Sequence, residues 1–95
     1  MGSQSHSEGD STVAKGSSSH AAGKGTIASG KFQFAYGQYN IEDTTNKYVT
    51  IIGDGTDDKN RSNIYTCDWN GNIWTKGDVL IGEDNISIKN KLAEK

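Results

Sequence analysis

Glycine recurs at a fixed interval of seven residues through the first forty residues of the chain. A small residue stands two places before each glycine, and a further residue, hydroxylated in all but the last unit, stands two places before that. The glycines are Gly9, Gly16, Gly23, Gly30 and Gly37, the small residues are Ser7, Ala14, Ala21, Ala28 and Ala35, and the earlier residues are Ser5, Thr12, Ser19, Thr26 and Gln33. A fixed period indicates a repeat architecture, in which each unit is stabilised by its neighbours.

The alternation within each unit indicates β-strands. Side chains two residues apart lie on the same face of a strand, so Thr26, Ala28 and Gly30 point to one side. A helix with this spacing would carry a glycine every two turns, a coiled coil requires larger apolar residues, and collagen requires glycine at every third position. We therefore predict a thin β-roll in which two seven-residue halves close one 14-residue coil, with glycine supplying the backbone freedom of each corner.

The interior of such a roll would hold only small side chains and would bury little apolar surface. Leu, Ile, Val and Phe make up 16 of the 95 residues, below the roughly 20% that, together with high net charge, marks disordered chains. The formal net charge is only −2, however, which does not fit that class. We therefore predict an all-β chain that shares its apolar surface with copies of itself, with Val13, Ile27 and Phe34 as candidate interface residues.

The composition also argues against several function classes. A net charge of −2 without a basic run disfavours nucleic-acid binding, and no apolar stretch reaches the length that membrane insertion requires. A single cysteine, Cys67, excludes an internal disulfide and a multi-cysteine zinc site. No pairing of a base with a nucleophile is visible. We expect no enzyme activity and no cofactor, and the sequence assigns no catalytic, cofactor-binding or metal-ligating residue.

The repeat units are similar to those of a known group of fibrous proteins. Ser5-His6-Ser7-Glu8-Gly9, Ser19-His20-Ala21-Ala22-Gly23 and Thr26-Ile27-Ala28-Ser29-Gly30 resemble the head repeats of trimeric autotransporter adhesins. They resemble more closely the same repeats in tail-fibre proteins of phages and prophages of Gram-positive bacteria. The segments Gln38-Tyr39-Asn40, Ile52-Gly53-Asp54-Gly55-Thr56, Arg61-Ser62-Asn63 and Asp68-Trp69-Asn70-Gly71-Asn72 resemble the region after the repeats in such fibres, so the similarity spans roughly residues 3 to 82.

This resemblance implies a left-handed parallel β-roll that trimerises around a fibre axis on a virion. It implies a structural segment of a phage tail fibre involved in attachment to the host surface. Two alternatives stay open: a head fragment of a bacterial trimeric adhesin on a cell surface, and a non-catalytic segment of a fibre-borne glycan-degrading enzyme. The acidic place of the repeat holds Glu8 once and then Ala22 and Tyr36, which argues against a shared role for that carboxylate.

The second half of the chain has a different pattern. Strand-like segments are expected over residues 47–52, 63–69, 72–76 and 78–81, with a hairpin signal at Asn70-Gly71, so we predict a small antiparallel β-meander. The predicted segments are a roll over residues 3–40, a meander over 41–83 and a tail over 84–95. Ile81, Asn85, Ile88 and Leu92 have a 4-3-4 spacing that could start a coiled-coil stalk, with a frayed C-terminus as the alternative.

Candidate contact residues lie in the polar loop over residues 53–63. If the chain binds a host cell-surface glycan or protein, we expect Asp57, Asp58, Asn60 and Arg61 to make the contacts, and the alternative is a solvated linker. Trp69 and Trp74 are expected mainly to pack, and to serve as a stacking surface only if exposed.

The two histidines, His6 and His20, lie one predicted coil apart and should stack above one another. If their face met the threefold axis, each layer would offer three nitrogens to a metal or an anion. The alternative is that both are ordinary exposed or hydrogen-bonded residues of the repeat.

Overall fold

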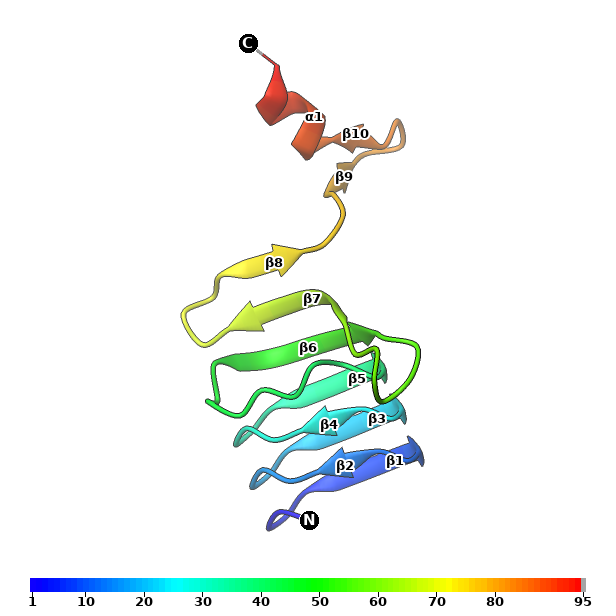
Figure 1. Ribbon diagram of the computed structural model, residues 1–95. Coiled ribbons are helices and arrows are strands. Elements are labelled where there is room, and N and C mark those ends of the chain that lie inside the picture. The colour runs from blue at the N-terminus through cyan, green and yellow to red at the C-terminus, as the bar shows by residue number, and fades with distance from the viewer. Residues whose placement is uncertain (95) are drawn as a thin grey trace.

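The fold is a solenoid of stacked β-strands, shown by a computed structural model that describes residues 1–94 (Figure 1). Four parallel strands lie side by side along one face of about four turns: β1 (His6–Asp10), β3 (His20–Lys24), β5 (Phe34–Gln38) and β6 (Tyr48–Asp54). Two short strands, β2 (Val13–Ala14) and β4 (Ile27–Ala28), pair in parallel and form the opposite face. The predicted all-β class and the stacked repeat coils are therefore confirmed.

The strand register gives the length of each coil. His6 pairs with His20, which pairs with Phe34, so both steps cover 14 residues, as predicted. The next step is longer, because Phe34 pairs with Thr50 across 16 residues. The two additional residues fall where the seven-residue pattern of the sequence stops.

The interior of the roll is built from the small residues of the repeat. Its buried apolar residues are Ala14, Ala21, Ala28, Ala35 and Ile51, and the polar repeat residues Ser19 and Thr26 are buried beside them. Alanine permits the two sheets to lie close together, but it contributes little apolar area per residue. Only Ile51, in the last turn, is a large buried apolar side chain.

The repeat glycines are required mainly by close approach between coils. A Cβ atom on Gly16 would lie 2.1 Å from the carbonyl oxygen of Gly30, and one on Gly9 would lie 2.1 Å from that of Gly23. The predicted need for glycine's backbone freedom holds for every second repeat glycine only. These are Gly9, Gly23 and Gly37, with φ of 105°, 102° and 92°. Gly16 and Gly30, which alternate with them, do not have positive φ. Most left-handed corners instead use other residues at a seven-residue step: Gln4, Ser11, Ser18, Gly25, Phe32, Tyr39 and Asn46.

The strands of the predicted meander continue the main sheet of the roll. β7 (Asn63–Asp68) and β8 (Ile73–Thr75) add to β6 in antiparallel order, so one six-stranded sheet runs from β1 to β8. The expected fourth strand does not join this sheet. β9 (Leu80–Ile81) pairs instead with β10 (Ile86–Ser87) in a separate hairpin.

The chain ends in a short helix, α1 (Ile88–Ala93), whose N-cap Ser87 accepts a hydrogen bond from the backbone N–H of Asn90. Ile88 and Leu92 of the predicted 4-3-4 spacing lie in this helix, whereas Ile81 belongs to β9. The stalk stays a prediction, and the last residue of the predicted tail, Lys95, lies outside the described residues. Within residues 1–94, no helix has the length and apolar character needed to cross a membrane.

Candidate functional site

Two apolar outer surfaces of the roll contain the predicted interface residues. Val13 is 39% exposed and lies beside the half-buried Ile27 on the outer face of the β2–β4 sheet. Phe34 is 38% exposed and lies on the outer face of the six-stranded sheet, because its neighbour Ala35 points into the roll. The structure therefore places Val13 and Ile27 together and Phe34 on the opposite side.

Several exposed apolar residues were not identified from the sequence. Ile41 is 52% exposed and stands 14 residues after Ile27, so the repeat period itself was the signal that could have found it. Ile73 is 65% exposed and lies on the outer face of the main sheet, where it pairs with Cys67. Nothing in the local sequence distinguishes that face of the hairpin from the inner one.

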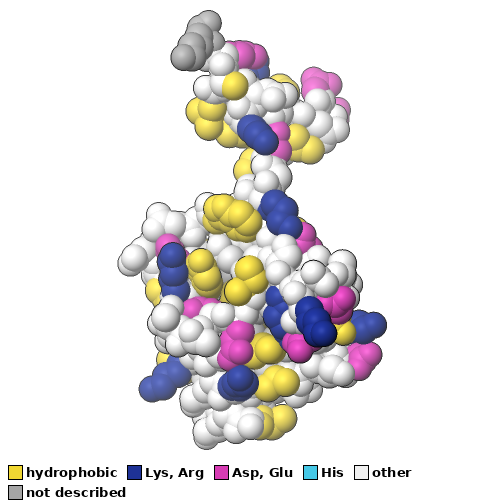
Figure 2. Space-filling model, in the orientation of Figure 1, with side chains coloured by type: hydrophobic (Ala, Val, Ile, Leu, Met, Phe, Trp, Pro, Cys, Tyr) yellow, Lys and Arg dark blue, Asp and Glu magenta, His cyan; other side chains and the backbone are white. Residues whose placement is uncertain are grey.

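A groove of about 470 Å³ opens where the second sheet of the roll ends. Ile51, Thr66 and Trp74 are register partners on the inner face of the main sheet. Ile51 is fully buried, whereas Trp74, two strands further along the sheet, stays 49% exposed. The groove also has polar and charged walls, which include Ser62, Asn63, Asp68, Asn72 and Lys76. Figure 2 shows hydrophobic and charged side chains interspersed over the body of the molecule.

The end of the second sheet is closed by the side chain of Asn40. Its Oδ1 accepts the backbone N–H of Ile27 at 2.8 Å, and its Nδ2 donates to the carbonyl of Ile27 at 3.0 Å. These are the two backbone groups that a further strand beside β4 would pair with. The buried Asn40 amide thus takes the place of that strand.

A second buried polar cluster stabilises the 16-residue coil that connects β5 to β6. Gln33 Nε2 donates to Asp43 Oδ2 and to the carbonyl of Tyr48, both at 2.9 Å. Asp43 also accepts the backbone N–H groups of Tyr48 at 2.8 Å and Thr45 at 3.1 Å. Burial alone would raise the pKa of Asp43, but these hydrogen bonds outweigh burial and lower its pKa below the ordinary value. Asp43 is therefore a carboxylate that orders the turn into β6.

The predicted contact loop folds onto itself and onto the roll. Asp57 Oδ1 accepts the backbone N–H of Lys59 and the side-chain amide of Asn60, each at 2.9 Å. Arg61 donates to Asp58 at 2.7 Å, and its Nη1 donates to the carbonyls of Gly25 at 2.8 Å and Asn40 at 3.0 Å. These hydrogen bonds of Arg61 anchor the loop to the roll. Asp57, Asp58 and Asn60 are exposed. The contact of these three residues and of Arg61 with a receptor stays a prediction.

Trp69 and Trp74, expected mainly to pack, are 47% and 49% exposed. Trp69 Nε1 donates to Asn46 Oδ1 at 3.4 Å, which ties the β7–β8 hairpin to the turn before β6. Trp74 offers an aromatic face to the groove.

Comparisons with family models, with curated proteins and with solved structures find no match to this chain.

Proposed function

We propose that this chain is a structural segment of a homotrimeric phage tail fibre involved in attachment to the host surface. The observation that carries the proposal is the imbalance between the interior and the outer faces. Four alanines and one isoleucine make up the buried apolar core, whereas large apolar side chains such as Val13, Phe34 and Ile73 are more than one-third exposed. Association with copies of itself would bury the side chains that a single chain leaves in water.

The shape of the molecule supports a role as a fibre segment. Its principal extents are 50 × 28 × 24 Å, and β1 and α1 lie toward opposite ends of the long axis (Figure 1). A segment with this layout can connect to further segments at both ends. Its strands run across the long axis and stack along it, so backbone hydrogen bonds carry an axial load from one coil to the next.

A closed ring of three chains would cover both apolar faces, provided that the contact rotates each chain by a third of a turn relative to the next. A cyclic trimer uses two different surfaces of each chain, one for each neighbour. The face with Val13 and Ile27 would pack against the face with Phe34 of the next chain. A twofold dimer would use one face only and leave the other in water.

Attachment to the host is the second part of the proposal. The exposed loop residues Asp57, Asp58 and Asn60 and the groove beside Trp74 offer polar and aromatic groups for a surface glycan or protein. Arg61 would act indirectly, since its hydrogen bonds hold the loop in place.

Sedimentation equilibrium of the purified chain tests the proposal. We expect a mass three times the 10.2 kDa of one chain. Ile27→Asp and Phe34→Asp should each shift the distribution toward smaller species, because each introduces a charge into a different side of the proposed interface. Thr44→Asp, at an exposed turn, is the matched control and should leave the trimer intact. A folded monomer at all concentrations would overturn the proposal.

A further inference from the structure

The first two strands of the main sheet bring three potential metal ligands together on its outer face. β1 and β3 pair in parallel with His6 opposite His20, and Glu8 stands two residues after His6 on the same face. All three side chains therefore start from neighbouring positions of a flat sheet. His6 and His20 are the only histidines of the chain.

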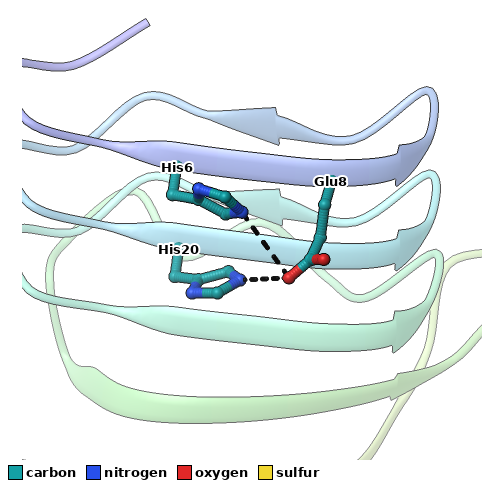
Figure 3. Close-up of side chains that lie close together, drawn as sticks. All are labelled: His6, Glu8 and His20. Atoms are coloured by element: carbon teal, nitrogen blue, oxygen red, sulfur yellow. Dashed lines mark hydrogen bonds and ion pairs between the residues drawn. The ribbon is translucent and has the colours of Figure 1, made fainter.

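The side chains converge on one point. His20 Nε2 lies 2.9 Å from Glu8 Oε1, and His6 Nε2 lies 3.6 Å from the same oxygen. One ligand atom from each residue lies within 4.8 Å of the others. Figure 3 shows both imidazoles turning their Nε2 edges toward the carboxylate.

The rings on this face restrict where the histidines can point. The His20 ring lies between its neighbours, with centroids 4.6 Å from the His6 ring and 4.4 Å from the Phe34 ring, against which it stacks. The pair of histidines is thus held by ring contacts as well as by the strand register. A ligand set with restricted side chains loses less entropy on binding than a mobile one.

We propose that His6, Glu8 and His20 form a binding site for a divalent transition-metal ion, with Zn²⁺ the best fit. Two imidazoles and one carboxylate are a common ligand set for zinc, and a fourth position would be left for water. Tetrahedral zinc with bonds of about 2.1 Å places its ligand atoms about 3.4 Å apart. The two nitrogen–oxygen distances in the cluster, 2.9 and 3.6 Å, lie on either side of that spacing, and all three ligand atoms lie within 4.8 Å of one another.

The site belongs to the first coil and its neighbour alone. At the place that Glu8 occupies, the next two coils carry Ala22 and Tyr36, and Phe34 takes the place of a histidine in the third. The ion would therefore join β1 to β3. Because β1 is the edge strand of the sheet, the ion would fasten the coil that has a neighbour on one side only.

Isothermal titration of the tag-free chain with zinc chloride, under reducing conditions, tests the inference. We expect one zinc ion per chain and a higher midpoint of thermal unfolding with zinc. His20→Ala and Glu8→Gln each remove one of the three ligands, so each should weaken binding by about tenfold or more, the loss that changing even a partner of a ligand causes. The matched control Glu83→Gln removes an exposed carboxylate far along the chain and should bind as the wild type does.

A spectroscopic measurement guards against loss of folding in a variant. In the intact wild-type chain, zinc should shift the NMR signals of the two imidazoles and of residues next to Glu8, and leave those of Cys67 unchanged. No binding by the folded wild type at millimolar zinc would overturn the proposal. So would binding that survives both His20→Ala and Glu8→Gln, or binding that is lost only in Cys67→Ser.

Discussion

The roll and the C-terminal segment of this chain are built on different principles. In the roll, from β1 to β6, backbone hydrogen bonds and glycine contacts lock each coil to the next, and alanines fill the interior. In the C-terminal segment, formed by β9, β10 and α1, no described residue is buried. Figure 2 shows this segment separated from the body by a narrow neck, with hydrophobic side chains on its surface.

The comparison shows how a repeat stabilises a region that has a small core. The roll repeats one unit, so each coil provides the neighbour that the next coil requires. The C-terminal segment has no repeat and exposes Leu80, Ile81 and Leu92, with Leu92 82% exposed. We therefore expect substitutions that disturb the packing between coils to lower the free energy of unfolding of the roll strongly. Substitutions in the C-terminal segment should mainly change its association with other chains.

Gly16→Ala should have the largest effect. The added methyl group would lie 2.1 Å from the backbone oxygen of Gly30, which cannot move without displacing the next coil. We expect the free energy of unfolding, measured by urea denaturation, to fall by more than about 4 kcal/mol.

Gly77→Ala is the matched control for that measurement. A Cβ at Gly77 meets no atom within 4 Å, and this glycine lies between β8 and β9. Its effect should stay within about 0.5 kcal/mol. Equal effects of the two substitutions would contradict the close packing of the glycine columns.

Asn40→Ala should have the next largest effect. It leaves the N–H and the carbonyl of Ile27 without the partners that close the second sheet. We expect a loss of about 2–4 kcal/mol in the free energy of unfolding, because an unsatisfied buried polar group costs about 1–3 kcal/mol. Asn90→Ala, on exposed α1, should change the same quantity little. If the two variants unfold alike, Asn40 does not substitute for a strand.

Lowering the pH should destabilise the roll through Asp43. Since hydrogen bonds lower the pKa of this carboxyl in the folded chain, its contribution is complete above the ordinary value of 3.8 and is lost as the pH falls below it. In the Asp43→Asn variant, the free energy of unfolding should therefore change less with pH between roughly pH 5 and pH 2. Asp84→Asn, in the exposed β9–β10 turn, should keep the wild-type slope. If Asp43→Asn leaves the pH dependence of the free energy of unfolding unchanged, Asp43 does not contribute to acid destabilisation of the roll.

Leu92→Asp should have the smallest effect on the stability of one chain. The side chain is 82% exposed, so its replacement should change the free energy of unfolding of the roll by no more than about 0.5 kcal/mol. If the C-terminal segment packs against copies of itself, light scattering should show weaker association. A large loss of roll stability would contradict the independence of the two regions.

The sequence predicts the roll better than the rest of the chain, for a physical reason. Seven-residue spacing and alternation of small residues fix coil length, strand register and the buried alanines, and all three are confirmed. The roles of Asn40 and Gln33 were not predicted. Their amides act on backbone groups that become neighbours only after the coils stack, and no local pattern encodes that contact.

The candidate sites show the same limit. The stacking of His6 and His20 is a consequence of the repeat, whereas the approach of Glu8 to both depends on side-chain direction. The hydrogen bonds of Arg61 to Gly25 and Asn40 were not predicted, because they join segments far apart in the sequence, and a contact of Arg61 with a receptor stays a prediction. The failure of β9 to join the main sheet has a similar origin, because β9 finds a local partner in β10.

Removal of whole and half coils tests most directly the claim that two unlike seven-residue halves make one coil. Deleting residues 17–30 removes one full coil and joins Gly16 to Lys31, so every remaining strand keeps its sheet. Deleting residues 17–23 removes half a coil and brings a β4-type half to the place of a β3-type half. We predict cooperative urea unfolding, followed by circular dichroism, for the first variant and its loss for the second. Equal stability of the two variants, or cooperative unfolding of the half-coil deletion alone, would contradict the account.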